Sequence, residues 1–261
     1  MATPQRSPLL RALLFLLPPR RFLFRPDALQ LAILKSALPG GVALDLPADL
    51  NRIPKRTRSL LALLPPRPSD PAWLADVRTA TFQRSARVLA LAGPALKALA
   101  QADIPVLALK GLAMVLSVYR DFQSRAMADL DLLVPPERIG QGVEVLLGLG
   151  WTLRDRHPDG FKVSPGHVDH SVTLRHAGQV EIDLHYFSLD ENRVPGDDEG
   201  LWARSQARQV LGAPCRIPCA EDLLVGVCAH GYRAQRGVPR WVADARLLLD
   251  GPVDWDLVLA E

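Results

Sequence analysis

Two short β-like runs place carboxylates at alternate positions, and this pattern constrains the fold more than any other feature of the chain. The first run reads Met-Ala-Asp-Leu-Asp-Leu-Leu-Val over residues 127–134 and ends at two prolines. Because successive side chains of a strand point to opposite faces, Asp129 and Asp131 share one face, about 6 to 7 Å apart, while Leu130 and Leu132 face the core. Aspartate is a poor strand former, and like charges this close repel. The pattern therefore predicts a strand at the edge of a cleft in which cations neutralise both carboxylates.

The second run, Gln-Val-Glu-Ile-Asp-Leu-His-Tyr over residues 179–186, repeats the pattern with Glu181, Asp183 and His185 on one face. Three carboxylates on two strands can hold two magnesium ions, the arrangement used for in-line displacement at phosphorus. In this scheme Asp129 and Asp131 bind both ions, and Asp183 binds the ion that activates the attacking hydroxyl. The alternative for the carboxylates is a solvated face of a half-exposed sheet. His185 would orient a carboxylate, contact the nucleotide or face solvent.

A Lys-Gly pair precedes the aspartate run and is a candidate phosphate site. Residues 104–110 form a short apolar β-like run, Gly111 breaks it, and residues 112–119 suit a helix. Backbone N–H groups and the helix dipole favour a phosphate at such a junction. Lys110 would add a positive charge there. Arg125, just before the aspartate run, would contact a phosphate or balance the charge of Asp129.

The remaining pattern predicts an α+β fold in which a small mixed sheet is flanked by helical regions on both sides. Alternation on either side of Ala177-Gly178 predicts an antiparallel hairpin of residues 169–176 and 179–187. Prolines between residues 51 and 68 indicate a linker with one short helix. Helical periodicity covers residues 27–37, 70–102, 137–148, 220–232, 241–249 and 254–261. We expect an N-terminal helical segment and linker (1–68), a core with an entry helix and the sheet (69–190), and a C-terminal helical region (191–261).

Several of these motifs together resemble the uncharacterised nucleotidyltransferase family of the DNA polymerase beta superfamily. The resemblance covers roughly residues 70–249. It is carried by Leu-Lys-Gly-Leu-Ala (109–113), Tyr119, Arg125, Asp129-Leu-Asp-Leu-Leu-Val, Gly150-Trp151, Glu181-Ile-Asp-Leu-His-Tyr, His230-Gly231 and Trp241-x-x-Asp244.

The resemblance implies a minimal nucleotidyltransferase sheet and an NTP donor whose α-phosphorus is attacked by a hydroxyl or phosphate of a small-molecule or peptide acceptor. It also implies two Mg²⁺ ions held by Asp129, Asp131 and Asp183. The superfamily has Gly-Gly or Gly-Ser shortly before its aspartate pair, whereas Gly111 here is followed by leucine at a longer distance. The nucleotide-contact candidates are Lys110, Gly111, Arg125, His185, His230 and Asp244.

Some alternatives remain open at this point. His230 lies in an apolar helical pattern and could instead be a hydrogen-bonded core histidine. The whole site could be a degenerate one that binds nucleotide or a partner without chemistry. A third possibility is a transferase that moves a glycosyl or other phosphate-linked group onto a phosphorylated acceptor.

Composition excludes several other classes of protein. Thirty-one basic against 28 acidic residues give a net charge of +3, too small for a protein that coats nucleic acid or an anionic membrane. No apolar run reaches the roughly 18 residues that span a bilayer, and residues 9–17 suggest a short amphipathic or buried helix. Three clustered cysteines do not form a disulfide framework. We therefore expect no nucleic-acid partner, no stable membrane insertion and a cytoplasmic location.

Overall fold

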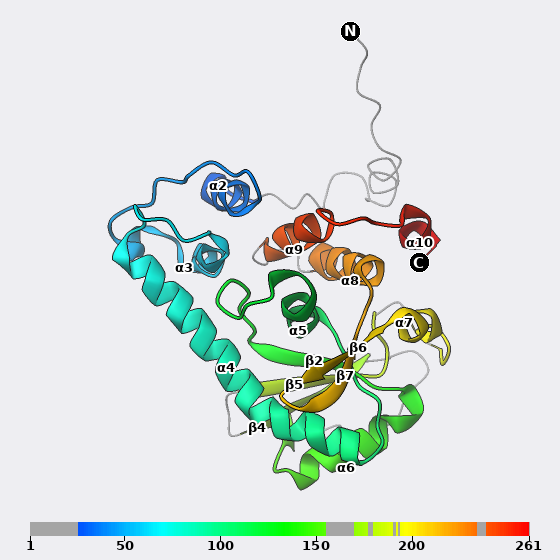
Figure 1. Ribbon diagram of the computed structural model, residues 1–261. Coiled ribbons are helices and arrows are strands. Elements are labelled where there is room, and N and C mark those ends of the chain that lie inside the picture. The colour runs from blue at the N-terminus through cyan, green and yellow to red at the C-terminus, as the bar shows by residue number, and fades with distance from the viewer. Residues whose placement is uncertain are drawn as a thin grey trace.

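The computed structural model describes residues 26–154, 170–176, 180–189, 192, 194–233 and 239–260 (Figure 1). Its centre is a seven-stranded sheet in the order β3-β4-β5-β2-β1-β7-β6. The pairs β2/β5 and β1/β7 are parallel and the other neighbours are antiparallel, so the expected mixed sheet is confirmed. The strands are β1 (Leu107–Ala108), β2 (Asp129–Leu133), β3 (Thr152–Leu153), β4 (Ser171–His176), β5 (Val180–His185), β6 (Gln206–Val210) and β7 (Ala213–Ile217).

Helices cover both faces of this sheet, which confirms the α+β class. In Figure 1, α4 and α6 lie on one side of the strands, and α5, α8 and α9 lie on the other. The longer helices are α2 (Ala28–Ala37), α4 (Ala72–Gln101), α6 (Ile139–Gly148), α8 (Ala220–Arg233) and α9 (Arg240–Leu248). The shorter ones are η1 (Leu50–Arg52), α3 (Lys55–Arg58), η2 (Leu61–Leu63), α5 (Lys110–Met114), η3 (Val115–Tyr119), η4 (Pro136–Arg138), α7 (Glu199–Arg204) and α10 (Trp255–Ala260).

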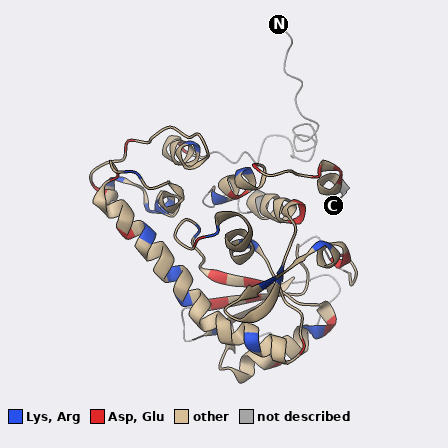
Figure 2. Cartoon of the chain, in the orientation of Figure 1, with Lys and Arg blue, Asp and Glu red and all other residues tan. Residues whose placement is uncertain are grey.

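Alternation along β2 and β5 decides which face each side chain occupies. Leu130, Leu132, Ile182 and Leu184 are fully buried in the main core. Gly142 of α6 lies against this apolar face, where an added Cβ would stand 3.1 Å from a methyl carbon of Leu184. The apolar side chains thus hold α4 and α6, and the carboxylates are left on the face that α5 and α8 approach. Figure 2 shows these acidic positions on β2 and β5.

Residues 51–68, predicted as a linker with one short helix, contain the short helices α3 and η2 and pack into the protein. Leu60, Leu61 and Leu64 are buried, and together with Ile33 of α2 they form a second core. Ala243 of α9 is also part of this core, so the first and last helical regions pack together. The prolines do interrupt helical periodicity, but the short apolar run between them is compact enough to pack against α2 and α4.

The β6–β7 hairpin was not predicted. Its two-residue loop consists of Leu211 and Gly212, both with left-handed backbone (φ 51° and 78°), as in the tight turns that match strand twist. Only the glycine signals such a turn in the sequence. The strand expected at residues 104–110 is also shorter than predicted, because only Leu107–Ala108 pairs in the sheet.

Most other predicted elements are confirmed within a few residues. The predicted hairpin is observed as β4 and β5, while its Ala177-Gly178 connection lies outside the described residues. The short helix predicted at residues 9–17 also lies outside them. Within the described ranges, no helix has the length and apolar character needed to cross a membrane.

Candidate active site

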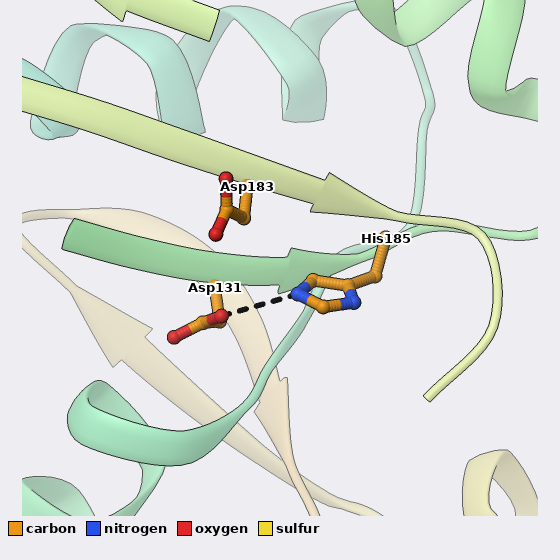
Figure 3. Close-up of side chains that lie close together, drawn as sticks. All are labelled: Asp131, Asp183 and His185. Atoms are coloured by element: carbon orange, nitrogen blue, oxygen red, sulfur yellow. Dashed lines mark hydrogen bonds and ion pairs between the residues drawn. The ribbon is translucent and has the colours of Figure 1, made fainter. Parts of the chain in front are cut away.

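The parallel pairing of β2 with β5 brings two aspartates side by side. Asp131 is in register with Asp183, and Leu133 is in register with His185. Figure 3 shows Asp131, Asp183 and His185 converging on one side of the two strands. One ligand atom from each residue lies within 4.8 Å of the others. This spacing is compatible with a shared cation.

Asp131 is the most enclosed carboxylate of the group, with 5% of the residue exposed. Lys110 donates from Nζ to its Oδ1 over 2.6 Å, and the Nε2 atom of His185 lies 3.1 Å from the same oxygen. Burial opposes ionisation, but the hydrogen bond with His185 and the charge of Lys110 outweigh it. The pKa of Asp131 is therefore held well below its usual range. Asp131 is thus an anion at neutral pH.

Lys110 reaches Asp131 from a strained backbone position. Its φ is 42°, in the left-handed region that few residues other than glycine adopt. The preceding residue is fixed to the aspartate strand, because the Leu109 amide donates to the carbonyl of Asp131 over 2.9 Å. Strain of this kind is retained where the surrounding structure holds it and is common at functional sites. Here it turns the chain from β1 into α5 with the ammonium group facing Asp131.

Gly111 follows Lys110 in α5 and has a packing reason to be glycine. A Cβ at this position would lie 3.2 Å from Cγ of Met127, a tight contact in the core. The predicted phosphate-binding junction is thus a helix start in the structure, and Gly111 lets the segment before β2 pack closely against it. The contact with Met127 accounts for this glycine without a ligand.

The other two predicted metal ligands differ in their surroundings. Asp183 accepts a hydrogen bond of 2.6 Å from the Thr173 hydroxyl of the neighbouring strand β4. Asp129 is exposed at the start of β2, opposite Glu181. Desolvation and then the charges of Asp131 and Asp183 raise the pKa of Asp129 to about 6. Because Asp129 reaches solvent, we attribute more of this shift to the repulsion than to burial.

His185 is buried to 1% exposure beneath these carboxylates. Its ring centroid lies 4.9 Å from that of His170, with the planes tilted by 46°. Its Nδ1 atom is buried without a hydrogen-bond partner among the described residues. Its other ring nitrogen, Nε2, contacts Asp131, so the structure makes His185 a neighbour of that carboxylate and not a solvent-facing strand residue.

A second buried aspartate, Asp244 of α9, binds Arg125. The guanidinium donates from Nε and Nη2 to the two carboxylate oxygens over 3.1 and 3.0 Å. Tyr119 donates to the same carboxylate over 2.7 Å, and burial together with the Asp244 charge raises the pKa of Tyr119. Arg240 donates to the carbonyl of Ala126 over 3.4 Å, and burial and the charge of Arg125 lower its pKa to about 10. This cluster fixes the loop before β2 to α9.

Gly231 explains how α8 and α9 pack beside that cluster. A Cβ on Gly231 would come within 2.3 Å of the Trp241 ring, so any larger residue would displace it. The His-Gly and Trp-x-x-Asp motifs of the sequence therefore meet in space. Gly231 admits Trp241, and one turn later Asp244 holds Arg125.

These groups surround a cavity of about 460 Å³, a size typical of small-molecule sites. His230 is an exposed residue on its wall, which excludes the alternative of a core histidine. Gly111, Asp129 and Asp131 are absent from the lining, although Asp131 lies directly behind Lys110. The predicted residues that line the cavity are Lys110, Arg125, Asp183, His185, His230 and Asp244.

Sequence reasoning missed a polar turn that also lines the cavity. Buried Asp198 accepts hydrogen bonds from the Ser188 amide over 3.0 Å and from Nδ2 of Asn192 over 2.8 Å. All three residues face the cavity. No spacing or motif marks them, because the turn follows β5 without regular periodicity. Thr173 was missed as well, although it lies on the carboxylate side of an alternating strand.

Comparison with known proteins gives one family match. The model of an uncharacterised nucleotidyltransferase family matches residues 55–261. The search of curated proteins found no match.

Solved structures are also similar to parts of this chain. The solution structure of the antibiotic-resistance factor ANT(2'')-Ia is 16% identical, with a TM-score of 0.47 over 67% of this chain and 89% of that one. The crystal structure of ANT(2'')-Ia in complex with adenylyl-2''-tobramycin is 15% identical, with a TM-score of 0.44 over 66% and 92%. An antigenic nucleotidyltransferase-like protein from Paracoccidioides brasiliensis is 14% identical, with a TM-score of 0.44 over 64% and 77%.

Proposed function

The chain belongs to the uncharacterised nucleotidyltransferase family, and from this premise we propose that it transfers a nucleotidyl group from an NTP to a small-molecule or peptide acceptor. The acceptor hydroxyl or phosphate oxygen attacks the α-phosphorus of the NTP. A new P–O bond forms, the bond to the bridging oxygen breaks, and pyrophosphate leaves. The observation that carries this proposal is the register of β2 and β5, which sets Asp131 beside Asp183, a residue that lines the cavity.

The donor set fits a hard divalent cation. Magnesium prefers carboxylate oxygens, together with water and substrate phosphates. Asp131 and Asp183 each use only Oδ1 in hydrogen bonds with described residues, so the other oxygen of each has no partner among these residues. Asp129 adds a third carboxylate. Its acidic neighbours raise its pKa, so a nearby positive charge would stabilise its ionised form. We propose that Asp129, Asp131 and Asp183 hold two Mg²⁺ ions, which when bound would neutralise charge on the phosphates.

His185 is better suited to positioning than to metal binding. Its Nε2 contacts Asp131 at the oxygen that Lys110 also occupies. A partner of this kind fixes the direction in which a ligand carboxylate points. We therefore assign His185 to hold one oxygen of Asp131, so that the other oxygen is left for a cation.

The two cations of the cavity wall have different roles in this proposal. Lys110 is 31% exposed at its side chain, so it can contact a phosphate while remaining near Asp131. Arg125 directs Nε and Nη2 to Asp244 and Nη1 to the Ala126 carbonyl. It therefore offers the phosphates a fixed positive charge, and Asp244 acts through Arg125 without contacting the nucleotide.

Proton transfer requires no further residue. Asp183 lines the cavity and has one oxygen without a hydrogen-bond partner among the described residues, so it can accept the proton of an attacking hydroxyl. His230 is exposed on the same cavity wall and would contact the donor or the acceptor. We place the reaction in the cytoplasm, in keeping with three cysteines that are all unpaired.

Titration calorimetry with each of the four NTPs in the presence of Mg²⁺ tests the proposal. We expect one NTP to bind, and Asp183→Asn to abolish the magnesium-dependent part of its affinity. Glu181→Gln is the matched control, because Glu181 lies two residues away on the same face of β5 but pairs with Arg154 and Arg175. It should leave NTP binding unchanged.

The outcomes separate the candidate functions. Absence of NTP binding by the wild-type chain would contradict the proposal and direct attention to nucleotide sugars as donors. Tight binding without pyrophosphate release, in a broad screen of hydroxyl and phosphate acceptors, would indicate a nucleotide-binding module. Release that depends on both Mg²⁺ and Asp183 would support nucleotidyl transfer.

A further inference from the structure

Helix α8 forms a second wall of the cavity, built from a different kind of residue than the charged end. Leu223 and Val227 are buried and line the cavity, and Gly226 lies between them on the same wall. His230 follows Gly226 by four residues, so it lies one turn further along the same helix face. The wall therefore presents two aliphatic side chains, a glycine and then an exposed imidazole.

Neither the backbone nor the packing requires glycine at position 226. The residue is in the interior of α8 and does not have left-handed backbone. A Cβ built on it meets no atom within 4 Å, so alanine would fit and would favour the helix. Gly231 in the same helix is the opposite case, since its Cβ would collide with Trp241. Gly226 thus leaves open a part of the cavity that the protein does not fill.

We propose that Gly226 forms a notch in the cavity wall against which the base of the NTP packs. This inference rests on the proposed function. The cavity has a charged end at Lys110, Arg125 and Asp183 and a largely apolar wall at α8. An NTP has the same division, because its triphosphate is charged and its base is a flat ring. With the triphosphate at the cations, the base meets the α8 wall, where a side chain at position 226 would take its space.

The inference is tested by a substitution that should raise thermal stability and lower the affinity for the NTP. Gly226→Ala should raise the thermal midpoint by about 2 to 4 °C, because alanine favours a helix interior. The same change should weaken binding of the preferred Mg-NTP by about 10- to 200-fold, the usual effect of one added carbon in a filled pocket. Binding of inorganic triphosphate with Mg²⁺ should stay unchanged, since it lacks a base.

Gly140→Ala is the matched control. Gly140 is a helical glycine of α6 with no atom within 4 Å of its added Cβ, and it does not line the cavity. This variant should gain stability and keep wild-type NTP affinity. Gly226→Leu fills more of the notch and should abolish NTP binding while triphosphate binding persists.

The outcomes distinguish this inference from the function on which it rests. Wild-type affinity of Gly226→Ala for the NTP would overturn the notch while leaving the proposed function intact. An equal loss of NTP and triphosphate affinity would overturn the placement of the base. Failure of the wild-type chain to bind any NTP would overturn the proposed function and the inference together.

Discussion

Asp131 and Asp244 are buried almost equally, at 5% and 3% exposure, and each is paired with a cation, yet the two pairs are built differently. Asp244 engages Arg125 through both oxygens and also accepts from Tyr119. Asp131 uses a single oxygen, which accepts a hydrogen bond from Lys110 and also contacts His185. The first pair is complete within the protein and holds its shape. In the second pair, one oxygen of Asp131 has no hydrogen-bond partner among the described residues, and Lys110 is exposed enough to change partners.

Removing the charge of Asp131 is the most direct test of this difference between the two pairs. Asp131→Asn should lower the rate of nucleotidyl transfer by at least about 10³-fold, since a metal site is worth several kcal/mol of charge stabilisation. The fold should persist, because asparagine keeps the shape of the side chain. Pyrophosphate release and an unfolding curve measure the two effects. Near-wild-type turnover of a folded variant would refute the metal assignment.

The opposite result is expected at the complete pair. Asp244→Ala should destabilise the protein by about 3 to 5 kcal/mol, because it leaves the Arg125 charge buried without its partner. Urea unfolding of the variant measures this loss. Tyr119→Phe, which removes one hydrogen bond and keeps the ion pair, should cost clearly less. If Asp244→Ala unfolds at the wild-type urea concentration, the cluster does not stabilise the loop before β2.

A smaller effect is expected at Asp129, which is repelled by Asp131 and Asp183 and forms no ion pair with a described residue. Its pKa in the folded chain is raised from 3.8 to about 6, so this group stabilises the fold below pH 3.8 and loses that contribution as the pH rises through 6. Asp129→Asn should therefore be more stable than wild type at pH 7 without metal, by about 1 kcal/mol after allowance for solvent screening. Thermal unfolding between pH 3.5 and 8 should show the two proteins converge at low pH. A constant difference would exclude ionisation as its cause.

The smallest effect is expected at Glu181, which lies on the same face of β5 as Asp183 but outside the proposed metal site. Its partners Arg154 and Arg175 are exposed, so Glu181→Gln should cost less than about 1 kcal/mol of stability. The turnover number and the magnesium requirement should match those of wild type. A large loss of turnover would extend the catalytic carboxylates beyond Asp183.

The parts of the fold that could be predicted are those encoded locally. The alternation of Asp129, Leu130, Asp131 and Leu132 identifies β2 and separates its faces, because strand geometry has a period of two residues. Helical periodicity identified α4 in the same way. The expectation that Asp131 and a carboxylate of the second run lie on adjacent strands followed from those two patterns.

The pairings between distant residues could not be predicted. Lys110 is a phosphate candidate in the sequence, but in the structure it pairs with Asp131, 21 residues further along the chain. Arg125 and Asp244 are separately identifiable by motif, whereas their mutual ion pair spans 119 residues. Such contacts depend on strand register and helix packing, which no local pattern contains. The burial of the leucines of η2 in a second core was not predicted for the same reason, since it depends on α2, α4 and α9.

Arg240 joins parts of the chain that are far apart in sequence, since it donates both to the Ser59 carbonyl and to the Ala126 carbonyl. Ala243 of the same helix belongs to the second core, and Asp244 forms the ion pair with Arg125. The helices before α4 therefore support the loop that leads into β2. A chain trimmed to the sheet would retain every carboxylate of the site but would lose the support that aims Arg125. The carboxylates of this enzyme thus lie in the middle of the polypeptide, whereas the support for Arg125 comes from segments before and after them.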